Sequence, residues 1–278
     1  MPTTHHADVE LYYETFGAST DPTLLMVNGL GSQSINYDDE WCERFASQGF
    51  RVIRFDNRDT GLSSKLDGVD YTLRDMAGDA VAVLDANAVD RAHVMGVSMG
   101  GMIVQRLAID HPDRVLSLTS VMSRTGGPGY GESSPEAFAV LTAKPAKSRD
   151  EYVENHIAAH GVYGSKPEWI DEEYLRDRAR RAYDRCFCPK GIARQAKAIR
   201  ADGDRGAELQ RLAVPTLVMH GDRDTLIDKS GGRRTAELIP GARYVEIAGM
   251  GHDYPRAVWD LWVDTWTDFA RSADSANA

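Results

Sequence analysis

The pattern of apolar and polar residues along the first part of the chain predicts strands that alternate with helices. Short, largely apolar runs predict strands at 24–27, 50–55, 92–95 and 115–122. Residues 9–16 alternate and end at Gly17, which predicts a further strand paired with the segment just before it. Strands separated by helices are typical of βαβ units, so we expect a mostly parallel sheet. The predicted helices lie at 39–48, 72–88 and 99–111.

The clearest helix signal lies at residues 72–88. An apolar stripe that includes Leu73, Met76 and Leu84 follows the 3.6-residue period, and the aspartates lie off that stripe. Thr72 followed three residues later by Asp75 resembles a capping box, which predicts where the helix begins.

The alternation stops after residue 125. A glycine-rich loop at 126–131 is followed by polar, helical segments at 152–160, 171–186 and 192–201. Strands resume at 216–219 and 243–247, with helices around 235–239 and at 257–270, and a frayed polar tail is expected from Arg271 onwards. Because both flanks continue one sheet, we interpret 125–205 as a helical cap inserted into a core formed by 1–124 and 206–278.

Composition narrows the class of protein. The 278 residues are 42% hydrophobic and 27% charged, which suits a globular chain with a sizeable core. The formal charge of −10 argues against nucleic acid and anionic membranes as partners. No apolar run approaches the roughly 18 residues of a membrane span, and the N-terminus does not read as a secretory signal, so we expect a cytoplasmic location. Three cysteines predict neither a disulfide framework nor a zinc site.

The pentapeptide Gly96-Val97-Ser98-Met99-Gly100 fits G-x-S-x-G, the pattern of a nucleophile elbow. The pattern alone is weak, because a glycine-rich turn between a strand and a helix would match it. Its context strengthens it: a predicted strand ends just before it and a predicted helix begins at Met99. The turn forces the serine backbone into a strained conformation and leaves no room for side chains on the flanking residues.

Other polar residues follow the carboxyl ends of the predicted strands, where ligands bind in open parallel sheets. They include Ser98, then Asp222 and Asp224, then His252, and a serine, an acid and a histidine in this chain order match a hydrolase triad. A serine hydroxyl attacks only when a base takes its proton, and imidazole titrates near neutral pH. Ser98 is therefore the candidate nucleophile and His252 the candidate base.

Two further expectations concern the groups around this pair. Backbone N–H groups of Leu30 and Met99 are candidate donors to an oxyanion, because Leu30 lies in the loop after an early strand and Met99 follows the serine. Asp222, Asp224 and Asp253 are all candidates for the acid, and composition does not choose among them. The position of Asp224 beyond the strand end, within the turn, favours it over Asp222 and Asp253.

On these motifs the chain resembles the α/β-hydrolase superfamily from about residue 8 to 270. The segments 56–63, 96–100 and 249–252 resemble aclacinomycin methylesterase and its relatives, which hydrolyse a methyl ester on a polyketide. The resemblance implies a mostly parallel, eight-stranded sheet flanked by helices, with a helical cap. Its G-x-x-D pattern also places the acid at Asp224. Where the family often has His-Gly at the oxyanion loop, this chain has Asn28-Gly29.

The leading hypothesis is therefore a serine hydrolase that cleaves a small to medium, apolar carboxylic ester, with methyl esters as one candidate class. It needs no cofactor and no metal, and its expected partner is a small-molecule ester. A cofactor-free haloperoxidase or perhydrolase, an enol-lactone hydrolase and a C–C bond hydrolase use the same triad. A ligand receptor with residual hydrolase activity is an alternative of another class. The sequence is silent on oligomeric state.

Three other groups of polar residues have simpler interpretations. His156 and His160 are four residues apart on a helix, but they lack a third ligand and the glutamate of H-E-x-x-H, so we interpret them as solvated or capping side chains. The arginines of 176–185 are interpreted as a solvated face paired with neighbouring acids, and Arg58 as a brace for its own loop.

Overall fold

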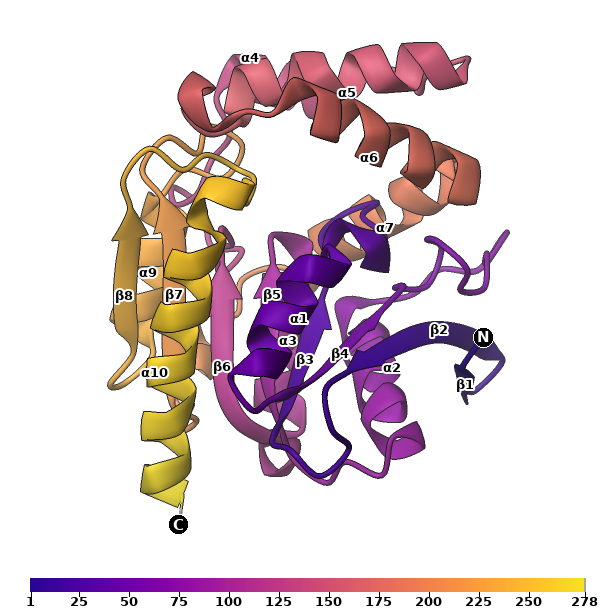
Figure 1. Cartoon of the computed structure of the whole chain (residues 1–278). Coiled ribbons are helices and arrows are strands. Elements are labelled where there is room, and N and C mark those ends of the chain that lie inside the picture. The colour runs from indigo at the N-terminus through magenta and orange to yellow at the C-terminus, as the bar shows by residue number, and fades with distance from the viewer. Residues whose placement is uncertain (278) are drawn as a thin grey trace.

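The computed structural model of the chain describes residues 1–277 and contains one twisted sheet of eight strands (Figure 1). The order across the sheet is β1-β2-β4-β3-β5-β6-β7-β8. β2 pairs antiparallel with β1 and β4, and the remaining neighbours are parallel. The predicted mostly parallel α/β sheet is therefore confirmed. The strands are β1 (Thr3–His6), β2 (Val9–Phe16), β3 (Thr23–Val27), β4 (Arg51–Phe55), β5 (Ala92–Val97), β6 (Val115–Val121), β7 (Thr216–Gly221) and β8 (Arg243–Ile247).

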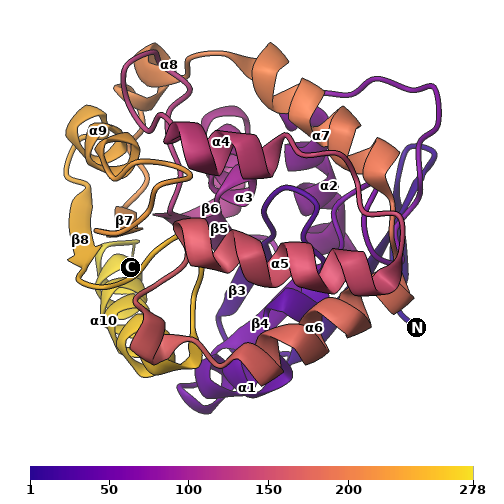
Figure 2. The same ribbon diagram turned by 90° about the horizontal axis from the view of Figure 1, so that it is seen from above.

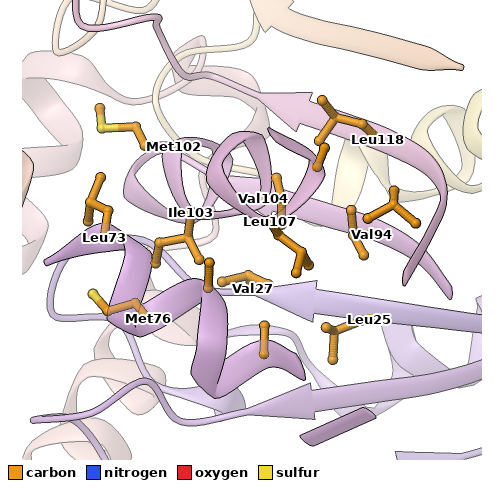
Figure 3. Packing of buried hydrophobic residues seen from close by; sticks show 14 of the residues in the cluster. Leu25, Val27, Leu73, Met76, Val94, Met102, Ile103, Val104, Leu107 and Leu118 are labelled. Carbon is orange, nitrogen blue, oxygen red and sulfur yellow. The ribbon is translucent and has the colours of Figure 1, made fainter. Parts of the chain in front are cut away.

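Helices cover both faces of this sheet. One face packs against α2 (Leu73–Ala86), α3 (Met99–Asp110) and α9 (Ser230–Leu238), and the other against α1 (Asp39–Ser47) and α10 (Trp259–Asn277). Figure 3 shows the core on the first face, in which Met76 of α2 and Ile103 of α3 pack near strand side chains such as Val27. The central strands are buried on both faces, which explains their continuous apolar runs.

The second core is dominated by aromatic rings. Trp41 of α1 lies 5.3 Å from Trp262 and 5.9 Å from Trp259, both of α10, measured between ring centroids. Trp266 continues the cluster toward Phe50 at 4.7 Å. These tryptophans are at most 2% exposed, so the cluster forms the interior between the two helices and the sheet.

The C-terminal helix corrects one expectation. α10 begins at Trp259, after a 3-10 turn at Arg256–Val258, and continues through Asn277 rather than fraying from Arg271. The His93 ring of β5 lies 3.2 Å from the Asp274 carboxylate, and Ala273 is buried. A polar residue on the last turns therefore meets a buried histidine of the sheet, and the polar composition of this segment concealed that contact. By contrast, the Thr72–Asp75 capping box at the start of α2 is present as predicted.

Helices lie over the carboxyl ends of the parallel strands. Between β6 and β7 the chain forms five α-helices within the described residues, and the first four of them cross this end of the sheet (Figures 1 and 2). Two further helical turns, at Ser34–Asn36 and Pro167–Trp169, border the same end. The helices between the two strands are α4 (Pro135–Leu141), α5 (Arg149–Tyr163), α6 (Glu172–Arg185), α7 (Pro189–Asp202) and the short α8 (Gly206–Leu209). A 3-10 turn at Pro112–Arg114 precedes β6. No helix within residues 1–277 is long and apolar enough to cross a membrane.

Buried ion pairs attach these helices to the loop after β4. Asp56 is fully buried, accepts hydrogen bonds from the N–H groups of Ser34 and Leu62, and pairs with Arg185 of α6 at 2.7 Å. Three residues on, buried Asp59 pairs with Arg194 of α7 at 2.7 Å. Two carboxylates of one loop thus take their countercharge from helices more than 100 residues away in sequence.

The Asp56–Arg185 pair generates a stability prediction. Arg185→Met removes the cation and leaves a buried carboxylate without its partner, so the free energy of unfolding should fall by about 3 kcal/mol. Arg181→Met on the same helix is the matched control, because Arg181 forms a half-exposed pair with Asp177 and should cost under about 1 kcal/mol. Urea unfolding followed by circular dichroism measures both. Equal losses in the two variants would contradict the role given to the buried pair.

Candidate active site

Ser98 lies at the sharp turn between β5 and α3. Its backbone has φ 55° and ψ −119°, a conformation that non-glycine residues rarely adopt. The surroundings hold it there: the Ser98 N–H donates to the carbonyl of Val121 at 2.9 Å, and the Ser123 hydroxyl donates to the Ser98 carbonyl at 2.8 Å. The strained serine backbone predicted for an elbow is therefore confirmed.

The two glycines of the pattern are required by close approach. A Cβ atom built on Gly96 would lie 2.1 Å from the carbonyl oxygen of Gly100, and one on Gly100 would lie 2.0 Å from that of Val27. Both obstacles are backbone atoms, which cannot swing away as the end of a side chain can. Strand and helix therefore pack directly through their main chains, and this contact presents the Ser98 side chain at the end of the strand.

His252 joins Ser98 to an acid. Its Nε2 lies 3.0 Å from the Ser98 Oγ, and its Nδ1 lies 2.7 Å from Asp224 Oδ2. An ionised carboxylate can only accept, which assigns the imidazole proton to Nδ1 and leaves Nε2 free to accept from the serine hydroxyl. The structure thus brings the three sequence-predicted side chains into one hydrogen-bonded chain.

Asp224 is buried and remains charged. Its Oδ1 accepts the backbone N–H groups of Leu226 and Ile227, both at 2.9 Å, and its Oδ2 also lies 3.2 Å from the ring of His220. Burial alone would raise the pKa of this carboxyl. Attraction to the His252 ring in its protonated form, with hydrogen bonds from His220 and His252, outweighs burial and lowers the pKa to about 2. Asp224 is therefore ionised throughout the range in which a histidine titrates.

The two other candidate acids have different partners. Asp222 is exposed and accepts the backbone N–H of Gly249 at 2.7 Å. Asp253 accepts the N–H of Ser165 at 3.0 Å and also the Ser165 hydroxyl. Of the three aspartates left open by composition, Asp224 is the one that faces the His252 ring.

The loop after β3 approaches Ser98 closely. A Cβ atom on Gly29 would lie 3.2 Å from the Ser98 Cβ, so a larger residue here would crowd the nucleophile. The next residue, Leu30, and Met99 at the first position of α3 both line the cavity beside Ser98. Their backbone N–H groups make no hydrogen bond with the described residues, which leaves two donors available at this point.

A cavity of about 260 Å³ opens on Ser98 and His252. Its lining is mixed in character. α5 and α6 contribute His156, His160, Tyr163 and Arg178. Apolar side chains of the lining include Val97, Met102, Met122, Leu141, Ile199 and Leu226.

The histidines and Arg178 show where the sequence interpretation failed. His156 and His160 are not a solvated pair: His160 is 8% exposed, and both line the cavity with their ring centroids 4.5 Å apart. Their spacing with Tyr152 at i, i+4 and i+8 signals one ring-bearing helix face, which the assumption that polar residues face solvent overlooked. Burial is the first cause that lowers the pKa of His156, followed by the charges of His160 and Arg178.

The arginines of residues 176–185 also differ in whether they face solvent or the interior. Arg176 pairs with Glu172 at 2.8 Å and Arg181 with Asp177 at 2.8 Å, as predicted for a solvated face. Arg178 and Arg185 instead face inward, toward the cavity and toward Asp56.

One other sequence expectation can be placed. Arg58 braces more than its own loop, because it pairs with buried Asp79 of α2 at 2.6 Å. Across residues 1–277, no group of three or more histidine, cysteine, aspartate or glutamate side chains is arranged to hold a metal ion.

Comparisons with known proteins agree with this architecture. Residues 22–254 match the family described as the alpha/beta hydrolase fold. The chain is 34% identical to rhodomycin D methylesterase DauP of Streptomyces sp. (strain C5), with 90% of this chain and 91% of that protein covered. It is 33% identical, with the same coverage, to rhodomycin D methylesterase DnrP of Streptomyces peucetius. The crystal structure of the enol-lactonase from Burkholderia xenovorans LB400 superposes with a TM-score of 0.78 at 26% identity, covering 96% of this chain and 99% of that one.

Proposed function

This chain belongs to the alpha/beta hydrolase fold family and is an ester hydrolase, and on that premise we propose that it cleaves small to medium, largely apolar carboxylic esters through Ser98, His252 and Asp224. One observation carries the proposal: an unbroken hydrogen-bonded chain runs from the Asp224 carboxylate through the His252 ring to the Ser98 hydroxyl. The hydroxyl stands on a strained turn beside a cavity, where an ester carbonyl can reach it.

The proposed reaction proceeds by two acyl transfers. The Ser98 Oγ attacks the ester carbonyl carbon while His252 Nε2 takes the hydroxyl proton. The tetrahedral intermediate collapses, His252 returns the proton to the departing alkoxide, and the acyl group remains on Ser98. A water molecule, activated by the same imidazole, then releases the carboxylic acid. Asp224 holds the ring in the required tautomer and stabilises the imidazolium in both halves of the reaction.

We assign the oxyanion of both intermediates to the backbone N–H groups of Leu30 and Met99. Among residues 1–277 these two donors have no other partner, and both border the cavity. Met99 also begins a helix whose dipole favours negative charge. Since the donors are backbone groups, the replacement of histidine by Asn28 in this loop leaves them in place. The mechanism as proposed uses no cofactor.

Methyl esters are the first substrate class we propose. Two relatives at 33 and 34% identity are named as methylesterases, and the apolar side chains that line the cavity suit a largely hydrocarbon acyl group. Enol-lactones are the second candidate, supported by the likeness to the enol-lactonase. A lactone is a cyclic ester, so the same three side chains would open it through the same acyl-enzyme.

We further propose that 125–205 acts as a cap inserted into a core of 1–124 and 206–278. The segment leaves the sheet after β6, returns before β7, and lies across the strand ends that carry Ser98 and His252. Leu141, Arg178 and Ile199 of this segment line the cavity, so the cap would shape the substrate site.

Ser98→Ala tests the proposed nucleophile. Loss of the hydroxyl should lower kcat by about 10⁴- to 10⁶-fold, because the oxyanion donors alone give only residual catalysis. Initial rates with p-nitrophenyl and methyl esters measure the loss, and circular dichroism controls for folding. A folded variant that keeps more than about a tenth of the activity would refute the serine mechanism. The wild type should release product steadily; a single stoichiometric burst would favour a receptor instead.

Asp224→Asn tests the proposed orienting acid, with Asp222→Asn as the matched control. An amide at 224 lets the imidazole take the wrong tautomer and should lower kcat by about 10⁴-fold, as loss of this acid does in serine proteases. Asp222→Asn keeps an acceptor for the Gly249 N–H, so it should retain most of the activity. Steady-state kinetics measure kcat for both variants. The opposite ranking in folded proteins would transfer the role to Asp222.

The pH profile tests the proposed base. The value of kcat/KM should fall as pH decreases from 8 to 5, because imidazolium cannot accept the serine proton, with histidine ordinarily titrating at about 6.5. Asp224 cannot produce this limb, since its pKa is lowered to about 2 and it stays ionised throughout. Initial rates in constant-ionic-strength buffers, with circular dichroism as the folding control, measure the profile. A flat kcat/KM over this range would exclude His252 as the base.

A further inference from the structure

The cavity beside Ser98 carries net positive charge in a strongly acidic protein. The chain as a whole has a formal charge of −10. Among the described residues, the lining includes two guanidinium groups, on Arg124 and Arg178, but one carboxylate, on Asp253. Both arginines are half-buried. A hydrocarbon ester needs no such charge, whereas a guanidinium group partly removed from water is stabilised by a counterion. The lining therefore points to a negatively charged part of the ligand.

Within residues 1–277, Arg178 is a cation of the cavity lining without an acidic partner. In the described part of the chain it makes no hydrogen bond and no ion pair, and its guanidinium carbon lies 5.6 Å from the Tyr174 ring centroid. Three other arginines of α6 do have acidic partners: Arg176, Arg181 and Arg185. Arg124 is less available, because its Nη1 donates to the carbonyl of Gly131 at 3.3 Å.

Asp253 does not neutralise Arg178. Its Oδ1 is occupied by the N–H and hydroxyl of Ser165, which hold this carboxylate toward the loop that follows α5. Among residues 1–277, Asp253 forms no ion pair with Arg178. The positive charge therefore remains available to a molecule in the cavity.

His156 supplies a second unsatisfied group beside Arg178. Its Nε2 is buried and has no hydrogen-bond partner among the described residues. The charge of Arg178 acts on both His156 and His160, where it adds to the burial that lowers the pKa of each ring. His156 is therefore a neutral ring that can donate one hydrogen bond, next to a guanidinium group that offers several.

We propose that Arg178, with the His156 ring beside it, forms a carboxylate-binding subsite, and that the preferred substrates are esters carrying a free carboxylate at the end remote from the scissile bond. The proposal rests on the proposed function and specifies its substrate class. A planar guanidinium group matches the two oxygens of a carboxylate, and His156 can donate to one of them. The apolar side chains of the lining would contact the hydrocarbon between the carboxylate and the ester at Ser98.

A series of matched ester pairs tests this subsite. The monomethyl esters of straight-chain dicarboxylic acids, from succinate to suberate, are compared with neutral esters in which an isopropyl group replaces the carboxylate; methyl 6-methylheptanoate is the partner of monomethyl adipate. In the wild type, kcat/KM should favour the acidic ester by at least about tenfold at one or more chain lengths, as a charge-assisted hydrogen bond predicts. Arg178→Met should abolish that preference, mainly through KM, and Arg178→Lys should restore part of it.

Arg181→Met is the control, because Arg181 lies on the outer side of the same helix and pairs with Asp177. It should leave the ratio between the acidic and neutral esters unchanged. No preference in the wild type at any chain length would overturn the subsite. An equal loss on both esters in Arg178→Met would also overturn it, because Arg178 would then have a structural role.

Binding to the Ser98→Ala variant separates this proposal from the proposed function. Calorimetric titration with monomethyl adipate should give a Kd that rises at least about tenfold when Arg178→Met is added. If the wild type hydrolyses none of the esters while this difference is measured, the proposed function fails and the subsite stands. If the esters are hydrolysed but neither the ratio nor the Kd depends on Arg178, the subsite fails alone.

Discussion

The direct main-chain contact between β5 and α3 is the constraint on which the site depends. Gly96 and Gly100 have no side chains, so the carbonyls of Gly100 and Val27 can occupy the space where Cβ atoms would stand. This close approach lets the chain turn within one residue. Ser98 takes up that turn with a positive φ, at a local cost that the surrounding parallel sheet and its helices sustain. The loops carrying Gly29, Asp224 and His252 are placed by neighbouring strands of the same sheet. Any displacement of the elbow would therefore separate the nucleophile from all its proposed partners at once.

The hydrophobic pattern was sufficient to predict most of the fold because the central strands are buried on both faces. Runs such as 24–27 can hardly be anything but strands between helices, and the order of strands and helices then determines the sheet. The candidate site followed from the same logic, since polar residues after buried strands must meet at one edge. Asp224 could be preferred over Asp222 only through turn position and family resemblance, and the distances to His252 now support that preference.

The failures share one physical cause, which is that polarity does not report exposure when polar groups have partners or line a cavity. Asp274 looked like part of a frayed tail, yet it meets His93 in the sheet. His156 and Arg178 looked solvated, yet they face the cavity. A helix that covers a polar site has two polar sides, so its pattern resembles that of an exposed helix. Only contacts between residues distant in sequence distinguish the two cases, and no local pattern contains them.

The aromatic core has an optical consequence. Four of the five tryptophans, Trp41, Trp259, Trp262 and Trp266, are buried together between α1 and α10, on the face of the sheet away from α2 and α3. The fifth, Trp169, lies among the helices over the strand ends, with the Lys166 ammonium 4.2 Å from its ring centroid. Intrinsic fluorescence thus has two separate origins: a coupled, water-free group that reports the integrity of the sheet, and a single indole that reports the segment above the nucleophile. The protein carries its own pair of emission probes, and replacing Trp169 alone would distinguish their signals.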